Sequence, residues 1–354
     1  MVINQWVPAA HRGDAIGDSA RRVRDILRSQ GHESHLFALS IDDDMRDEAR
    51  TFAGRESRGG DVTILHFAVP SPMTEAFGAL PRGRVLQYHN ITPAHFWADY
   101  HPGNFRLAVL ARRELASLAG RTDLALGDSE FNRQELAGLG FARTDVFPIA
   151  ADLDRISHAP AVPALDRWLD DGLTNFLFVG RVVPNKRIED IVRLAEHYKR
   201  YVDAYYRFIF VGRYDGVPRY YNTVRALIAQ LGWLQDRFLF TGPVPDHELA
   251  AYYRASSVYI SMSEHEGFCV PLLEAMAADL PILAYASTAV PDTLGGAGVT
   301  FAPKDFESAA ELLGLLAFDD DLRARVIQGQ RERLSCFRSD RIDAACRRLV
   351  EQFP

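Results

Sequence analysis

The sequence predicts an α/β protein made of two domains. Short apolar runs alternate with amphipathic stretches along the whole chain, which is typical of strands and helices that alternate around a parallel sheet. The chain has 354 residues, more than one hydrophobic core usually organises, so two cores are expected. Its contents of 47% hydrophobic and 25% charged residues are ordinary for globular domains.

Six strands and two clear helices are predicted in the first half of the chain. One helix covers residues 19–29, with Gly31 as the C′ residue, and the other covers residues 106–119. The predicted strands are residues 2–7, 35–39, 62–67, 84–88, 124–127 and 145–147.

A second series of strands follows a linker. Residues 154–171 contain two prolines and no strand pattern, so the linker is placed there, and the tail at 319–353 has helical periodicity. We therefore expect a first domain over residues 1–160, a second over 172–335, and a helix within 336–354 that could cross back to the first domain. The predicted strands of the second half are residues 175–179, 208–211, 238–241, 258–261, 281–284 and 299–301.

Composition excludes several classes of protein. The net charge of −7 argues against a nucleic-acid partner held by phosphate neutralisation. No apolar run approaches the roughly 18 residues of a membrane span, and the first residues do not read as a secretory signal. We expect a soluble, cytoplasmic protein, with peripheral membrane contact left open.

The three cysteines have neither metal nor disulfide spacing, so no metal site is expected from them.

The strongest motif places two glutamates, Glu266 and Glu274, around a glycine-containing turn that leads into a predicted helix at 272–278. Carboxylates accept hydrogen bonds from hydroxyl groups, and backbone N–H groups at a helix start suit phosphate oxygens. The alternative is that both glutamates simply face solvent, as most glutamates do. The flanking segments SMSEHEGF and EAMAADLP favour a binding site.

At this motif the sequence resembles family 4 of the retaining glycosyltransferases, whose hallmark is a Glu, seven residues, then a Glu. The resemblance implies the GT-B fold, in which two Rossmann-like domains face each other across a cleft. It also implies that Glu266 contacts hydroxyls of the donor sugar and Glu274 the ribose. The backbone N–H groups offered to the diphosphate and sugar would be those of Gly267, Phe268, Cys269 and Val270.

A second motif ends a predicted strand with Gly180 and then supplies Arg181 and Lys186. It matches the family's diphosphate clamp, in which two cations stabilise the charge that develops on the leaving nucleotide. A pair of surface cations is the alternative. The chain has only three lysines, and one of them stands at this position, which favours the clamp.

Residues 240–252 resemble the family's base-binding turn, where backbone groups of Val244 would meet the edge of the base. Gly212 and Arg213 end another strand and are expected to line the same cleft. For Arg213, a surface ion pair is an equally open alternative.

In the first half, His89 follows a strand, as does the family's histidine that contacts the transferred sugar; a satisfied interior histidine is the alternative. Asp128 also follows a strand, beside Ser129 as a helix N-cap, and is either structural or an acceptor contact. The loop at 11–17 occupies the place of the family's flexible glycine loop, with Gly13 and Gly17, and Asp14 is a candidate acceptor contact. This loop is not a dinucleotide fingerprint, because an acidic side chain within it would repel a pyrophosphate.

Three positions depart from the family pattern. Cys269 and Asp279 stand where glycine is common, and residues 148–152 replace the frequent Pro-Asn-Gly-Val-Asp. Cys269 would narrow the loop beside the sugar. This departure therefore leaves the identity of the donor open, but not the class of reaction.

The resemblance implies a retaining, metal-independent transfer of a hexose from a UDP- or GDP-hexose to a hydroxyl of a saccharide, glycolipid or small-molecule acceptor. No cofactor is expected beyond the nucleotide sugar, because Arg181, Lys186 and helix-end amides supply the positive field. The alternatives are a nucleotide-sugar-binding partner subunit without activity and an epimerase or phosphorylase of the same fold.

Overall fold

The computed structural model describes residues 1–11 and 13–353, and these form two compact units. The first unit contains Met1–His95, Gly103–Asp152 and Cys336–Pro354, and the second contains Phe96–Pro102 and Leu153–Ser335. Each unit is built on one parallel sheet, so the predicted α/β class with two Rossmann-like domains is confirmed. Within the described residues no helix is both long and apolar enough to cross a membrane.

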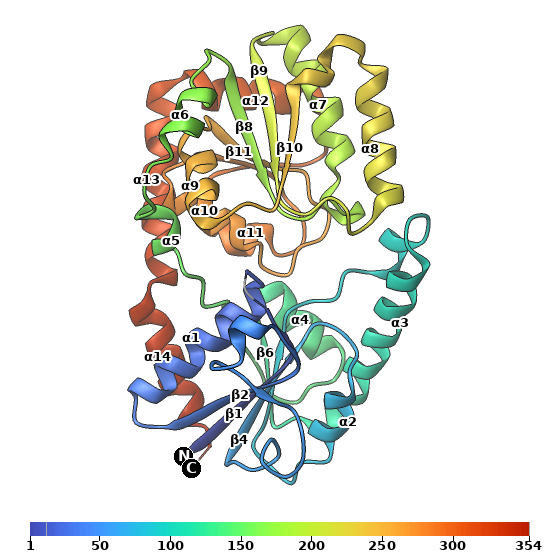
Figure 1. Ribbon diagram of the computed structural model, residues 1–354, viewed down its shortest axis with the longest axis vertical. Helices are drawn as coiled ribbons and strands as arrows, with labels where there is room; N and C mark the ends of the chain where they lie inside the picture. Colours follow the sequence, from blue (N-terminus) through green and yellow to red (C-terminus); the bar gives the residue numbers. More distant parts are fainter. Residues whose placement is uncertain (12, 354) are drawn as a thin grey trace. The chain divides into compact units, whose positions relative to one another are not determined.

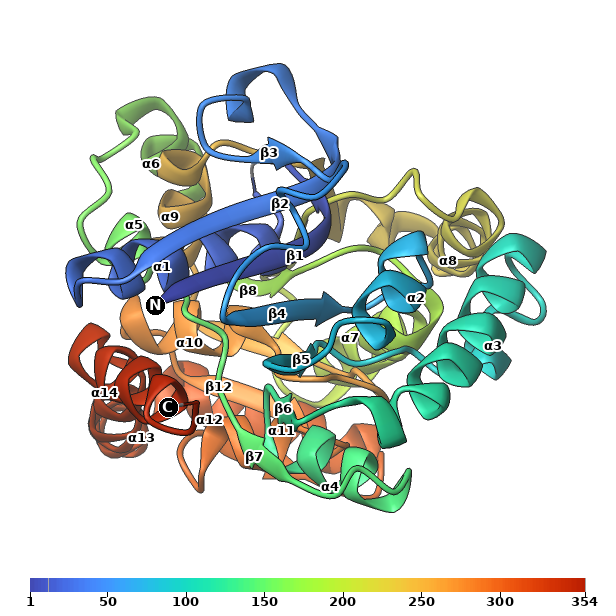
Figure 2. The same ribbon diagram turned by 90° about the horizontal axis from the view of Figure 1, so that it is seen from below.

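The sheet of the first unit has seven parallel strands in the order β3, β2, β1, β4, β5, β6, β7 (Figure 2). Its strands are β1 (Val2–Ala10), β2 (Glu33–Ile41), β3 (Arg50–Thr51), β4 (Val62–Phe67), β5 (Arg84–Tyr88), β6 (Leu124–Gly127) and β7 (Thr144–Val146). Its helices are α1 (Ala15–Ser29), α2 (Pro72–Gly78), α3 (Pro102–Ser117), α4 (Glu130–Gly138) and α14 (Ser339–Val350).

The last helix of the chain is part of the core of the first unit. Buried Ile3, Ile64 and Val85 from neighbouring strands form one cluster with Cys346 and Leu349 of α14. Helix α14 also packs beside α1 (Figure 1). The apolar face of α14 therefore has its partner in this sheet.

The sheet of the second unit has six parallel strands in the order β10, β9, β8, β11, β12, β13. Its strands are β8 (Thr174–Val179), β9 (Tyr206–Val211), β10 (Phe238–Gly242), β11 (Val258–Ser261), β12 (Ile282–Tyr285) and β13 (Val299–Phe301). Its helices are α5 (Asp154–Ser157), α6 (Pro163–Leu169), α7 (Ile188–Tyr201), α8 (Pro218–Gln230), α9 (Asp246–Arg254), α10 (Val270–Ala277), α11 (Val290–Leu294), α12 (Phe306–Phe318) and α13 (Asp320–Leu334).

The predicted strands are all present, some with both ends as predicted and others with ends shifted by one to three residues, and two local predictions need correction. Helix α1 begins at Ala15 rather than residue 19, because Asp14 accepts a hydrogen bond from the Gly17 N–H and caps the helix despite a glycine in its first turn. The segment predicted as a linker contains α5 and α6, which both pack on α9. It therefore lies in the second unit, and the last residue of the first unit before it is Asp152.

Each sheet has a point where the strand order reverses. In the second unit this switch point lies between β8 and β11, and in the first between β1 and β4. Open parallel sheets bind ligands beyond the carboxyl ends of the strands at such points. The loops after these four strands are therefore the natural places for a site.

Candidate functional site in the second unit

The two strongest sequence motifs meet at the switch point of the second unit. Lys186 lies in the loop after β8, and Glu266 lies in the loop after β11. The Lys186 ammonium donates to both carboxylate oxygens of Glu266, at 2.5 and 2.6 Å. Their side chains are 19% and 7% exposed, so the ion pair is largely removed from water. A charged pair at this point can exchange its partners for the phosphate and hydroxyl groups of a ligand.

Hydrogen bonds fix these two loops to each other. Asn185 is buried, and its side-chain amide donates to the backbone oxygen of His265. In return, the Glu264 N–H donates to the backbone oxygen of Asn185. The residues that flank Lys186 therefore hold the loop that carries Glu266.

A third loop, after β12, holds Glu266 from the other side. The Thr288 hydroxyl accepts the Glu266 N–H at 2.8 Å, and the Ser287 hydroxyl donates to the Ser263 backbone oxygen. Thr288 has a φ of 44°, a left-handed conformation that β-branched residues rarely adopt. Strain of this kind persists only where the surrounding contacts impose it, and it gathers at functional sites.

Gly180 and Gly212 bring the ends of β8 and β9 into close contact. A Cβ atom on Gly212 would lie 2.5 Å from the Gly180 carbonyl oxygen, so only glycine fits there. The next residues pair as well, because the Val182 N–H donates to the Arg213 oxygen. The Arg213 side chain is 67% exposed and pairs with Asp215, which is the surface ion pair that the sequence left open. Arg181 is exposed beside this contact.

Glu274 lies on α10 and is only 3% exposed. The Tyr253 hydroxyl donates to one of its carboxylate oxygens at 2.8 Å, and Arg155 donates to the other. Burial raises the pKa of Glu274, while Arg155 and the Tyr253 hydrogen bond act in the opposite direction. Glu274 is therefore a buried carboxylate with two partners from other elements.

Cys269 explains one departure from the family pattern. It directly precedes α10 with a φ of 72°, the left-handed region that glycine adopts without cost. Burial raises the pKa of the Cys269 thiol. Asp279, the other departure, has a φ of 53° and forms a two-pronged ion pair with Arg331. Both positions thus keep the glycine-like backbone with a different side chain.

The turn that leads into α10 contains the other predicted backbone donors. Gly267 and Phe268 precede Cys269, and Val270 is the first residue of the helix. The Phe268 carbonyl accepts the Thr293 hydroxyl, which ties this turn to α11. Val244 lies half-buried in the turn between β10 and α9. These residues all follow strands of one sheet, and their proposed ligand contacts remain predictions.

Predicted site residues of the first unit

The structure brings His89 and Asp128 together at the carboxyl ends of β5 and β6. His89 Nδ1 lies 2.8 Å from a carboxylate oxygen of Asp128, and both side chains are 1% exposed. The other ring nitrogen, Nε2, lies 2.9 Å from Nδ1 of His66, whose Nε2 contacts the Gln5 side-chain oxygen at 2.9 Å. Both nitrogens of His89 are therefore engaged inside this unit, which matches the interior-histidine alternative better than a direct side-chain contact with a sugar.

The glycine loop of the first unit follows β1, at the switch point of its sheet. Gly13 has a φ of 73°, and Asp14 caps α1 through the Gly17 N–H at 3.1 Å. His11 Nδ1 lies 2.8 Å from a carboxylate oxygen of Asp42. The Asp14 carboxylate thus has a structural task, and its contact with an acceptor remains a prediction.

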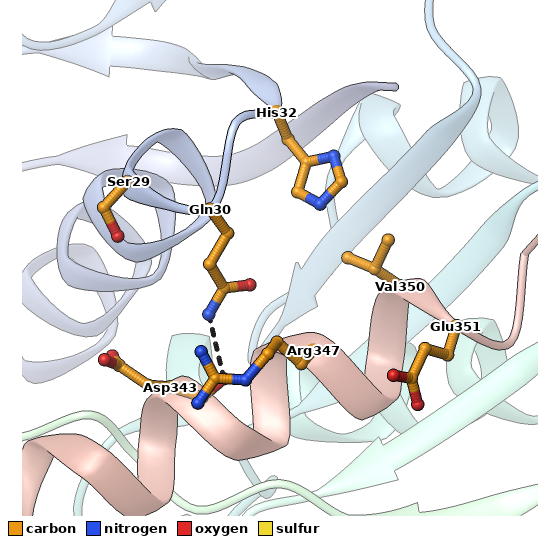
Figure 3. Close-up of a pocket in the computed structure, with 7 residues that line it drawn as sticks. All are labelled: Ser29, Gln30, His32, Asp343, Arg347, Val350 and Glu351. Atoms are coloured by element: carbon orange, nitrogen blue, oxygen red, sulfur yellow. Dashed lines mark hydrogen bonds between the residues drawn. The ribbon is translucent and has the colours of Figure 1, made fainter.

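A polar hollow lies near the amino ends of the strands of this sheet. Gln30 points toward α14 and donates to the Asp343 backbone oxygen at 2.9 Å (Figure 3). Ser29, Gln30 and His32 directly precede β2, so the hollow is at the amino ends of the strands, away from the edge where ligands of such sheets bind. It is lined by Ser29, Gln30, His32, Asp343, Arg347, Val350 and Glu351.

Sequence reasoning missed several side chains that hold the predicted site residues. Asn185 stands within the clamp motif, and Thr288 follows a predicted strand. The sequence therefore indicates that both lie near the site, but not which residues they contact. His66 is a polar residue inside a buried strand, which is itself a signal. Arg155 and Tyr253 gave no local signal, because their partner Glu274 is distant in the sequence.

Comparison with known proteins

Two parallel sheets of Rossmann type place the chain among the two-domain α/β proteins, and a lysine–glutamate pair lies at the switch point of one sheet. Residues 169–333 match the family model described as glycosyl transferases group 1. The matched residues all lie in the second unit.

Curated relatives and solved structures are similar over larger parts of the chain. A GDP-mannose-dependent alpha-mannosyltransferase of Mycobacterium tuberculosis is 30% identical over 65% of this chain and 57% of its own length. O-antigen chain mannosyltransferase B of Escherichia coli is 26% identical over 67% of this chain and 61% of its own length. The chain thus spans less than two thirds of these relatives.

The fold has a close match among solved structures. HepE of Anabaena, solved in complex with UDP-glucose, superposes with a TM-score of 0.76 at 16% identity, covering 99% of this chain and 100% of its own. At this identity the likeness shows the fold alone, and it confirms the predicted GT-B fold.

Proposed function

We propose that this protein is a retaining glycosyltransferase that moves a hexose from a nucleoside diphosphate sugar to a hydroxyl of a saccharide, glycolipid or small-molecule acceptor. The observation that carries the proposal is the contact between Lys186 and Glu266 at the switch point of the second unit. The family match over residues 169–333 supports the same class of reaction.

The pair fits the junction between sugar and diphosphate. In a nucleotide sugar, the anomeric carbon is bonded to an oxygen of the outer phosphate, so phosphate oxygens and sugar hydroxyls lie side by side. Lys186 would pass from Glu266 to the phosphate, and Glu266 would then accept sugar hydroxyls. Glu274, on the helix beyond the turn, would accept hydroxyls of the ribose.

The reaction exchanges one bond for another at the anomeric carbon. The bond from this carbon to the phosphate oxygen breaks, and the acceptor oxygen bonds to the same face. The acceptor proton passes to the leaving phosphate oxygen, so the products are the glycoside and the nucleoside diphosphate. Arg181 and Lys186 would stabilise the negative charge that develops on the leaving group, which is why we propose a reaction independent of metal and cofactor.

The donor is either a UDP-hexose or a GDP-hexose. One relative is named for GDP-mannose, and one structure of the same fold was solved with UDP-glucose. Calorimetric titration of the protein with UDP-glucose and GDP-mannose separates the two, and NMR of the anomeric proton in the product tests retention. A protein that binds neither donor and transfers no sugar would refute the proposal, and binding without turnover on any acceptor would indicate the partner-subunit alternative.

Chelation tests the metal-independent mechanism. Turnover should be unchanged in EDTA, because the described residues that would contact the diphosphate are cations and backbone amides. Loss of turnover in EDTA, restored by magnesium or manganese, would show that a metal ion shares this task.

A further inference from the structure

Arg155 lies outside the matched family domain but reaches its buried glutamate. It is on α5, in the segment that the sequence presented as a linker, and residues 169–333 form the matched domain. Its guanidinium donates to Glu274 through one terminal nitrogen and to Asp246 through the other. The side chain is 31% exposed, whereas Glu274 is 3% exposed. Arg155 is the cation that faces this carboxylate.

The other groups around Glu274 do not replace this cation. Tyr253 of α9 donates a neutral hydrogen bond, and burial raises its pKa well above the usual value, so it stays uncharged. Asp246 at the start of α9 acts to raise the pKa of Glu274. Tyr259 of β11 and the Cys269 thiol are buried nearby and also have raised pKa values. Arg155 therefore supplies the positive charge that opposes the desolvation of Glu274.

We propose that Arg155 is a positioning residue of the donor site, which keeps Glu274 ionised and aims its carboxylate so that it accepts the two ribose hydroxyls of a nucleoside diphosphate. A carboxylate offers about four acceptor positions. Arg155 and Tyr253 use two of them, which leaves two for a vicinal diol. A protonated Glu274 would lose one of these acceptors to its own proton. This inference rests on the function proposed above.

The test measures nucleotide affinity against pH. Calorimetric titration with UDP and GDP between pH 6 and pH 9 should show Arg155→Met binding at least tenfold more weakly than the wild type at pH 7. The deficit should shrink as pH rises, because Glu274 without its cation ionises only at higher pH. Arg155→Lys, which keeps the charge, should recover much of the affinity. The phosphate groups of the nucleotide also titrate in this range. Dividing the affinity of the variant by that of the wild type at each pH cancels their contribution.

Two controls isolate the ribose. A 2′,3′-dideoxynucleoside diphosphate should bind the wild type and Arg155→Met equally, because it has no hydroxyl for Glu274. Arg207→Met removes a buried arginine of the same unit, which pairs with Asp171 and Asn175 away from the switch-point loops. It should leave nucleotide affinity unchanged at every pH.

The outcomes separate this inference from the function on which it rests. Equal affinity of Arg155→Met and wild type for UDP and GDP at all pH values would overturn the inference alone, and so would an equal loss for the dideoxy compound. Titration of 13C-labelled glutamate in the ligand-free proteins reads the ionisation directly, and an unchanged Glu274 titration in Arg155→Met would also overturn it. A wild type that binds no nucleotide would instead refute the proposed function.

Discussion

The Nζ atom of Lys186 lies 2.5 and 2.6 Å from the two carboxylate oxygens of Glu266, although the residues belong to loops after different strands. Each side chain neutralises the charge of the other. A diphosphate that approaches Lys186 must therefore compete with Glu266. Together with the roles proposed above, this contact predicts that substitutions of the two glutamates have opposite effects on nucleotide binding.

Glu266→Gln should strengthen the binding of a free nucleoside diphosphate while it lowers turnover. The amide cannot neutralise Lys186, so the ammonium is free to bind phosphate, and the gain should be about 1.5 kcal/mol, the low end for charged hydrogen bonds. Glu274→Ala should do the reverse and weaken free-nucleotide binding by roughly 1.5 to 3 kcal/mol. Calorimetry with nucleoside diphosphate and with intact donor compares the two variants. An equal loss of nucleotide affinity in both would falsify this division of roles.

Removing either cation of the clamp should slow the reaction. Arg181→Ala and Lys186→Ala should each lower kcat roughly a hundredfold, the scale of losing one preorganised charge-stabilising donor. Lys199→Ala is the matched control, because Lys199 lies on α7 outside the switch-point loops. Steady-state kinetics with a saturating donor make the comparison. Normal turnover and donor affinity in both clamp variants would show that neither cation acts on the leaving group.

Substitutions of Thr288 should affect activity through the loss of its hydroxyl and stability through its positive φ. Its hydroxyl holds the Glu266 N–H, while its positive φ costs on the order of 1 to 2 kcal/mol for a residue with a Cβ atom. Thr288→Ser should keep turnover, and Thr288→Ala and Thr288→Gly should both lower it. Urea unfolding should nevertheless rank Gly above Ala in stability, the inverse of the usual order. The hypothesis does not survive a Thr288→Gly variant with wild-type turnover.

Burial of the Cys269 thiol should make stability fall in mild alkali. Its pKa is raised in the folded protein, and an unfolded cysteine ionises near pH 8.5. The unfolded state alone then releases a proton above that pH, so this thiol favours folding below pH 8.5 and costs about 1.4 kcal/mol by pH 9.5. Cys269→Ala should lose correspondingly less stability between pH 8 and 9.5 in urea titrations.

Two other cysteines serve as internal comparisons for that measurement. Burial also raises the pKa of the Cys346 thiol, to about 12, so Cys346→Ala should flatten the alkaline slope as well. Cys336 is exposed, and Cys336→Ala should leave the slope unchanged. An identical slope in all three variants and the wild type would show that the buried thiols do not govern alkaline stability.

Sequence patterns located the strands and the loops that carry the site, because each motif directly follows an apolar run. The pairing of Lys186 with Glu266 was not predicted, because the order of strands that places β8 beside β11 emerges only in the structure. The left-handed conformation of Thr288 could not be predicted, because β-branched residues disfavour a positive φ. Contacts with loops that are distant in the sequence impose this conformation. Arg155 had no readable pattern, because the charge that it balances is brought to it by tertiary packing.

The hydrogen bonds that join Gln5, His66, His89 and Asp128 predict which atoms carry their protons. The Gln5 amide nitrogen donates to the Ala20 oxygen, so the Gln5 oxygen faces His66 and must accept a proton from His66 Nε2. Burial lowers the pKa of His66 well below its usual value, so His66 is neutral and its Nδ1 accepts from His89 Nε2. His89 then shares its remaining proton, at Nδ1, with Asp128.

Substitutions of Asp128 test this order of donors and acceptors. Asp128→Ala leaves a buried histidine nitrogen without its partner and should cost at least about 3 kcal/mol of stability, as when one member of a buried ion pair is removed. In Asp128→Asn, the side-chain nitrogen can donate to a neutral His89 while the oxygen still accepts from Gln87, so the cost should stay near 1 kcal/mol. Asp123→Ala, which breaks a partly exposed pair with Arg84, is the control and should cost about 1 kcal/mol or less. Urea unfolding ranks the variants, and 15N spectra of labelled histidine read the protons. A proton on His66 Nδ1 in the wild type, or equal costs for Asp128→Ala and Asp128→Asn, would reverse the proposed order.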